Sequence, residues 1–202
     1  MGNIKLNNQN GRSMIEMLGV LAIIGVLSVG GIAGYSKAMM KYRINKTIEQ
    51  ITLIAGNIRT FFAPQRSYAG LNNTVIKKAK LVPDEMWDGN TIRGAWGFDV
   101  DVGTASKSSY EDKKAFYLLW RFPLDDEICI EMLTQDWANA GVKGMWLDYA
   151  GAVTVPVNID TAVTKCSAHL AGMGDVNFGG IFFYFDVNDS CWSDTDGNMS
   201  PI

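Results

Sequence analysis

The sequence predicts an α+β fold in which one long N-terminal helix packs on an antiparallel β-sheet in a globular domain. Three observations carry this prediction. An uncharged segment lies near the N-terminus, a stripe of apolar residues at helical spacing follows it, and the remaining chain alternates strand patterns with short helix patterns. The chain has 202 residues, of which 48% are hydrophobic, which suits one ordered domain with an appendage.

The first element is a predicted membrane-spanning helix. Residues 17–36 contain no charged side chain. A helix of this length extends for about 30 Å, enough to cross the hydrocarbon core of a bilayer. A secretory signal peptide has a shorter apolar core and then a small-x-small cleavage site, whereas "GYSKAMMKYRINK" follows here. We therefore expect a membrane helix that the mature protein retains.

The distribution of positive charges would place the C-terminal part in the cytoplasm, which conflicts with the export that the later observations imply. By the positive-inside rule, the side with more Lys and Arg residues faces the cytoplasm. Here Lys5 and Arg12 precede the apolar segment, and Lys37, Lys41, Arg43 and Lys46 follow it.

The helix is predicted to continue to residue 63 as an amphipathic segment. Apolar residues recur there at steps of four and three, which places them on one helical face. "AP" at positions 63 and 64 ends the helix, because the residue before a proline disfavours helical geometry. The apolar stripe is Ile44, Ile48, Ile51, Ala55, Ile58 and Phe62, and the other faces carry Asn45, Lys46, Glu49, Gln50, Asn57 and Arg59.

Strand and helix patterns alternate in the remaining chain. The clearest strand is "AFYLLWRF", in which Phe116, Leu118, Trp120 and Phe122 share one face. Acidic residues in a first turn and a glycine stop predict a helix in "LDDEICIEMLTQDWANAG". The expected strands are residues 95–102, 115–122, 151–157 and 177–187, and the expected helices are residues 124–141 and 160–170.

Charge and composition argue against several functions. The net charge is -3, so no basic field favours nucleic acid as a partner. His169 is the only histidine, which leaves no Ser-His, Cys-His or multi-His metal arrangement. We interpret it as a helix residue near a cap. We therefore expect neither enzymatic activity nor a cofactor.

The three cysteines allow more than one disulfide. An exported domain is expected to form one, and the residues alone permit Cys129 with Cys166, Cys129 with Cys191, or Cys166 with Cys191. Three reduced thiols would instead require a cytoplasmic domain. The spacings fit no zinc site.

An acidic tail offers the only metal candidate, for calcium. "DTDGN" resembles part of a calcium-binding loop, but the bidentate Glu of such a loop is missing. We favour a solvated acidic turn, and so no metal site, over calcium binding. The candidate ligands are Asp186, Asn188, Asp194 and Asp196.

The N-terminal residues carry a family resemblance. "G-RSMIE" followed by "MLGVLAIIGVLSVGG" resembles the leader and helix of type IV pilins and of the related type II secretion pseudopilins. The resemblance implies that a prepilin peptidase cuts after Gly11 and methylates the new N-terminal amine of Arg12. It also implies that Glu16 is the assembly residue, whose carboxylate pairs with the amine of a neighbouring, axially staggered subunit. Arg12 is a departure, because the family usually has an apolar residue there.

The C-terminal half resembles one pilin subclass. "LVPDEMWDGNTIRGAWGFDVDV", "FPLDDEICIEML" and "TKCSAHL…IFFYF" are similar to the globular domain of type IVb pilins. The resemblance implies a disulfide between Cys129 and Cys166.

Together these resemblances imply a structural subunit of a pilus. The expected parts are a leader at residues 1–11, a membrane and filament-core helix at 12–36, its amphipathic continuation at 37–63, and a globular domain at 64–202. The expected partners are other pilin subunits, the prepilin peptidase, the inner-membrane pilus assembly machinery and the inner membrane itself. The subunit would wait in the inner membrane and end in an extracellular pilus. The alternatives are a minor pilin, a type II secretion pseudopilin, or a membrane-anchored periplasmic enzyme or binding domain.

Overall fold

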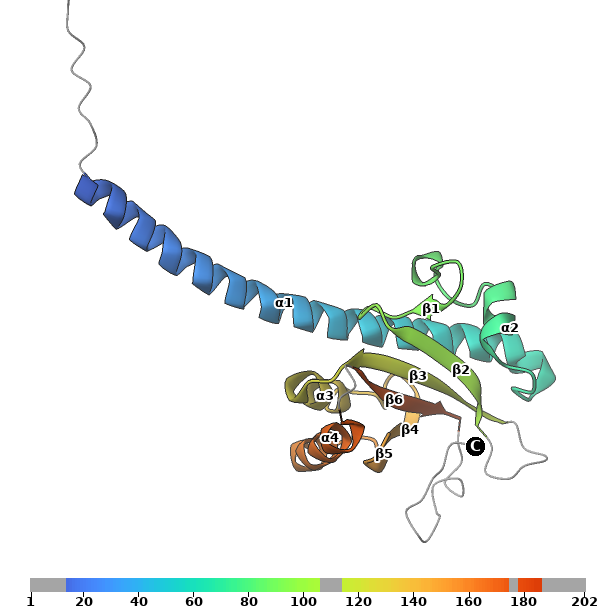
Figure 1. Cartoon of the computed structure of the whole chain (residues 1–202). Coiled ribbons are helices and arrows are strands. Elements are labelled where there is room, and N and C mark those ends of the chain that lie inside the picture. The colour runs from blue at the N-terminus through green and yellow to red at the C-terminus, as the bar shows by residue number, and fades with distance from the viewer. Residues whose placement is uncertain (1–13, 106–113, 175–177, 187–202) are drawn as a thin grey trace, which may run out of the picture. The chain divides into compact units, whose positions relative to one another are not determined.

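The computed structural model of the chain describes residues 14–105, 114–174 and 178–186 (Figure 1). Its contacts divide the chain into two units, residues 1–41 and residues 42–202. Helix α1 (Met14–Phe62) begins in the first unit and ends in the second. The predicted end of this helix is confirmed, because a short 3-10 turn, Ala63–Gln65, follows directly and contains the proline.

The second unit contains one six-stranded sheet in which all neighbouring strands are antiparallel. The strand order is β1-β2-β3-β6-β4-β5. The strands are β1 (Ile92–Arg93), β2 (Asp99–Ala105), β3 (Ala115–Pro123), β4 (Val142–Leu147), β5 (Gly151–Thr154) and β6 (Phe178–Phe185). The helices beside α1 are α2 (Asn73–Lys78), α3 (Asp126–Leu133) and α4 (Ile159–Met173). The predicted α+β class with a long N-terminal helix is confirmed.

The core of the second unit lies between the sheet and the part of α1 that belongs to this unit (Figure 1). The apolar stripe of α1 is buried as predicted, apart from Ile48, which is half-buried. The alternation in β3 is confirmed as well, because Phe116, Leu118, Trp120 and Phe122 are fully buried. On the other face of the sheet, Trp146, Phe182 and Tyr184 form a second apolar cluster.

One residue of α1 faces the core against expectation. The sequence places Gln50 outside the apolar stripe, but the side chain is buried, and its Oε1 accepts a hydrogen bond from the backbone N–H of Ala95 at 3.1 Å. A buried amide needs such a partner, because an unsatisfied polar group costs about 1–3 kcal/mol. The partner comes from a loop 45 residues further along the chain.

Several predicted boundaries differ from the structure. The strand expected at residues 95–102 begins only at Asp99, since a turn closed by Gly97 at φ 81° precedes it. The helix expected at 124–141 ends at Leu133, and the chain then turns so that Trp137 is buried and β4 can begin. The helix expected at 160–170 begins one residue earlier, at Ile159, because Asn158 caps it by accepting a hydrogen bond from the N–H of Thr161.

Candidate assembly site

Glu16 lies in the first turn of α1 and its side chain is exposed. The free N–H groups of a first helical turn favour an acidic side chain there. Gly11 and Arg12, the predicted cleavage and methylation residues, lie outside the described residues. The structure therefore positions one of the three predicted processing and assembly residues.

The helix around and beyond Glu16 presents an apolar surface on every side. Large apolar side chains from Met14 to Ile32 are more than half exposed, including Ile15 at 79% and Leu27 at 69%. Among the described residues, α1 is the helix that is long and apolar enough to cross a membrane, by length and composition. Exposed apolar area of this extent is unfavourable in water and requires lipid or other protein surfaces.

Glycine residues do not interrupt this helix. Gly19, Gly25, Gly30, Gly31 and Gly34 all have helical geometry, and apart from the adjacent residues and the backbone of the helix itself no atom lies within 4 Å of the position that a Cβ would occupy. Small residues on an apolar helix let the backbones of neighbouring helices approach closely. The surface thus suits close helix–helix packing.

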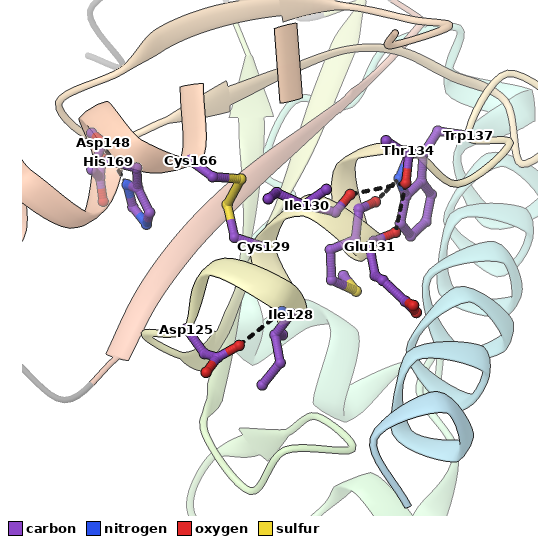
Figure 2. The surroundings of a disulfide bond; sticks show 11 residues. Asp125, Ile128, Cys129, Ile130, Glu131, Thr134, Trp137, Asp148, Cys166 and His169 are labelled. Atoms are coloured by element: carbon purple, nitrogen blue, oxygen red, sulfur yellow. Dashed lines mark hydrogen bonds between the residues drawn. A yellow bond between two sulfur atoms is a disulfide. The ribbon is translucent and has the colours of Figure 1, made fainter. Parts of the chain in front are cut away.

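A disulfide joins Cys129 of α3 to Cys166 of α4 (Figure 2). The Cα atoms are 5.8 Å apart, and both residues are fully buried. This is the pairing that the resemblance to type IVb pilins implied, and Cys191 lies outside the described residues. The bond closes a loop of sequence separation 37 that includes β4 and β5.

Caps and buried polar contacts hold the two helices beside the disulfide. Asp125 caps α3, because its carboxylate accepts from the N–H of Ile128 at 3.0 Å. His169 is fully buried near the end of α4, and its Nδ1 donates to the carbonyl oxygen of Asp148 at 2.6 Å (Figure 2). Burial raises the pKa of the Asp148 carboxyl. The single histidine thus has a structural position in the helix packing.

A second polar network fixes the end of β6. Arg59 of α1 donates from Nε and Nη2 to the two carboxylate oxygens of Asp186, at 3.1 and 2.9 Å, and from Nη2 to the carbonyl oxygen of Gly141. The hydroxyl of Tyr68 donates to Asp186 at 2.5 Å. Burial and this hydrogen bond to a carboxylate raise the pKa of Tyr68 well above its usual range.

Asp186 was one of the calcium candidates, and its two oxygens accept from Arg59 and Tyr68. The other candidates, Asn188, Asp194 and Asp196, lie outside the described residues. Within the described part of the chain, no group of three or more His, Cys, Asp or Glu residues could hold a metal ion. Sequence analysis missed this network because its partners carry no local pattern.

Comparisons with known proteins agree with this architecture. A family model described as Bundlin matches residues 37–181. The "Major structural subunit of bundle-forming pilus" of Escherichia coli O127:H6 (strain E2348/69 / EPEC) is 25% identical over 146 residues, which cover 71% of this chain and 72% of that protein. The subunit of the same description from Escherichia coli O111:H- is 26% identical over 129 residues, covering 62% and 64%.

A solved structure shares the fold. The crystal structure of type IV b pilin from Salmonella typhi matches with a TM-score of 0.50 at 14% identity, and the match covers 71% of this chain and 99% of that one.

Proposed function

The chain belongs to the bundlin family of type IV pilins, and we propose that it polymerises through α1 into a pilus of the bundle-forming kind. The observation that carries this proposal is the exposed apolar half of α1, with a single carboxylate, Glu16, in its first turn. A bilayer can cover that surface before assembly, and the helices of other subunits can cover it afterwards. The subunit thereby acts as a structural protein.

The chain is made as a precursor with a leader at residues 1–11. A prepilin peptidase cuts after Gly11 and methylates the amine of Arg12, as the "G-RSMIE" motif suggests. The cut leaves a positive amine at the start of an apolar helix. Arg12 adds a permanent charge beside that amine, which gives a carboxylate a second possible donor.

Glu16 selects the register of the filament. The amine of one subunit pairs with Glu16 of a neighbour that is shifted along the filament axis. A buried ion pair forms well only with good geometry, and a charge left unpaired in an apolar bundle is costly. Subunits in a wrong register are therefore rejected.

The parts of the chain then have separate roles. Residues 12–36 anchor the subunit in the inner membrane and later form the filament core, and residues 37–63 continue the helix. Residues 64–202 form the globular domain, which the buried disulfide stabilises in an oxidising compartment. The peptidase and the inner-membrane pilus assembly machinery act on the subunit before it joins the extracellular pilus.

Intact-mass measurement tests the processing step. The chain is expressed with and without a prepilin peptidase, and the expected product lacks residues 1–11 and carries one methyl group. Cleavage without methylation would contradict the proposal that the new N-terminal amine of Arg12 is methylated. A full-length mass in the presence of active peptidase would refute the precursor proposal.

Substitution of Glu16 tests the assembly step. Glu16→Ala should abolish incorporation into sheared filaments while the protein remains in the membrane fraction. Glu49→Ala is the matched control, because Glu49 is a second exposed glutamate of the same helix outside the apolar segment. Unchanged incorporation of Glu16→Ala, or an equal loss in Glu49→Ala, would show that Glu16 does not select the register.

A further inference from the structure

Two of the three polar side chains in residues 17–36 of α1 form a hydrogen bond within the helix. The hydroxyl of Ser28 donates to the carbonyl oxygen of Ile24 at 2.7 Å, and that of Ser36 to Ile32 at 3.1 Å. Lipid offers no hydrogen-bond partner, so such back-bonding is what a helix in hydrocarbon requires. The hydroxyl of Tyr35 is the exception in residues 17–36.

Tyr35 and Lys37 mark the end of this segment. Tyr35 is 67% exposed and Lys37 is also exposed, and neither polar group has a hydrogen bond or ion pair in the described part of the chain. Tyrosine is enriched where hydrocarbon meets headgroups, and lysine extends its ammonium from a helix end to that level. Lys37 follows Glu16 by about 30 Å of helix, which matches the hydrocarbon thickness.

The next positive residues of α1 all have partners within the chain, and these residues are Lys41, Arg43 and Lys46. The guanidinium of Arg43 lies over the ring of Trp96, 5.6 Å from its centroid, and the Nζ atom of Lys46 is 2.7 Å from a carboxylate oxygen of Glu85. Both contacts are inside the globular unit. The charges of Arg43 and Lys46 therefore have partners within the globular unit, whereas the charge of Lys37 has no partner in the described part of the chain.

We propose that Lys37, with Tyr35 beside it, binds the phosphate groups of anionic phospholipids while the subunit waits in the membrane. The inference rests on the membrane-anchored state in the proposed function. An anionic lipid suits the site because its headgroup supplies a net negative charge, whereas the choline of a zwitterionic lipid offsets its phosphate. This contact sets the depth of α1 so that Glu16 lies at the opposite headgroup layer and not in hydrocarbon. The contact also explains why Lys37 follows the apolar segment, although the positive-inside rule disfavours a positive charge on the exported side.

Lipid selectivity of the full chain tests the proposal. The uncleaved protein is reconstituted in vesicles of phosphatidylcholine and phosphatidylglycerol, and electron spin resonance of spin-labelled lipids gives the preference for each. Lys37→Gln should lower the preference for phosphatidylglycerol about fivefold, and Tyr35→Phe about twofold. Lys37→Arg should retain it, as should the matched control Lys78→Gln, an exposed lysine of α2.

The outcomes separate this inference from the proposed function. No preference in the unmodified protein, an unchanged preference in Lys37→Gln, or an equal fall in Lys78→Gln would overturn the lipid contact alone. Resistance to alkaline extraction is measured on the same vesicles. If the unmodified chain were extracted, the membrane-anchored state itself, and with it that part of the proposed function, would be refuted.

Discussion

Removal of the disulfide should cost the protein a large part of its stability. The double substitution Cys129→Ala and Cys166→Ala opens a loop with a sequence separation of 37. The loop-closure model of the unfolded chain assigns about 4 kcal/mol to a cross-link of this length at 25 °C. Both sulfur atoms come from fully buried residues, so their loss also leaves a small cavity. A typical domain is stable by only about 5–15 kcal/mol, and the effect should therefore be plain.

Urea unfolding of the full chain in detergent micelles measures this effect, with near-ultraviolet circular dichroism as the signal from the tryptophans. The double variant should lose about 4 kcal/mol of unfolding free energy relative to the unmodified protein. Reductant should lower the stability of the unmodified protein by a similar amount, because it opens the same cross-link, but without the cavity that the alanines leave. Cys191→Ala is the control, because Cys191 is not part of the observed bond.

Two results would refute the reasoning. A double variant within about 1 kcal/mol of the unmodified protein would mean that the bond does not restrict the unfolded chain as the model assumes. An equal loss in Cys191→Ala would mean that the stabilising bond in solution involves the third cysteine.

Three further predictions concern the globular unit, each measured by urea unfolding. Ile58→Ala, at a fully buried position of α1, should cost about 2–5 kcal/mol, whereas Leu53→Ala, 47% exposed on the same helix, should cost less than about 1 kcal/mol; equal losses would contradict the burial of the stripe. Gly179→Ala should destabilise the protein, because the new methyl group would collide with the buried imidazole ring of His169. The control Gly56→Ala, with open space around it, should stabilise the protein by about 0.5–1 kcal/mol. A harmless Gly179→Ala would refute the close packing of α4 on β6. Burial raises the pKa of the Asp148 carboxyl in the folded protein above its pKa in the unfolded chain. The stability that this carboxyl contributes is therefore fully present below the unfolded pKa and is lost as the pH rises through the folded pKa. The stability of Asp148→Asn relative to the unmodified protein should grow from about pH 4 to pH 7, and a constant difference would contradict the shift.

Periodicity predicted the elements that are buried on one side only. The spacing of apolar residues in α1 and the alternation in β3 each follow from one buried face, so the sequence alone indicates both. Strand β4 was missed for the opposite reason. From Gly144 to Leu147 its residues are all buried, and a strand covered on both faces has no alternation to detect.

Glu16 and the disulfide differ in how far the sequence alone predicts them. Glu16 stands out because a lone carboxylate beside an uncharged segment is conspicuous in any sequence. The pairing of Cys129 with Cys166 came from a resemblance and not from spacing, since the residues alone left three pairings open. A disulfide requires two Cα atoms within about 7 Å, and this proximity is a property of the folded chain.

The network around Arg59 and Asp186 shows most clearly where local patterns fail. The two residues are 127 positions apart, so no sequence window contains both. Arg59 therefore resembled a solvent-facing helix residue, and Asp186 resembled a metal ligand in an acidic tail. In the fold, Asp186 directly follows β6 and has a left-handed backbone conformation with φ 57°. Its carboxylate accepts hydrogen bonds from the guanidinium of Arg59 and from the hydroxyl of Tyr68. A calcium ion at Asp186 would have to displace a positive charge 2.9 Å away, and the exchange would leave a partly buried arginine without its carboxylate. The same side chain thus changes from a candidate ligand to a structural anion once its distant partner is known.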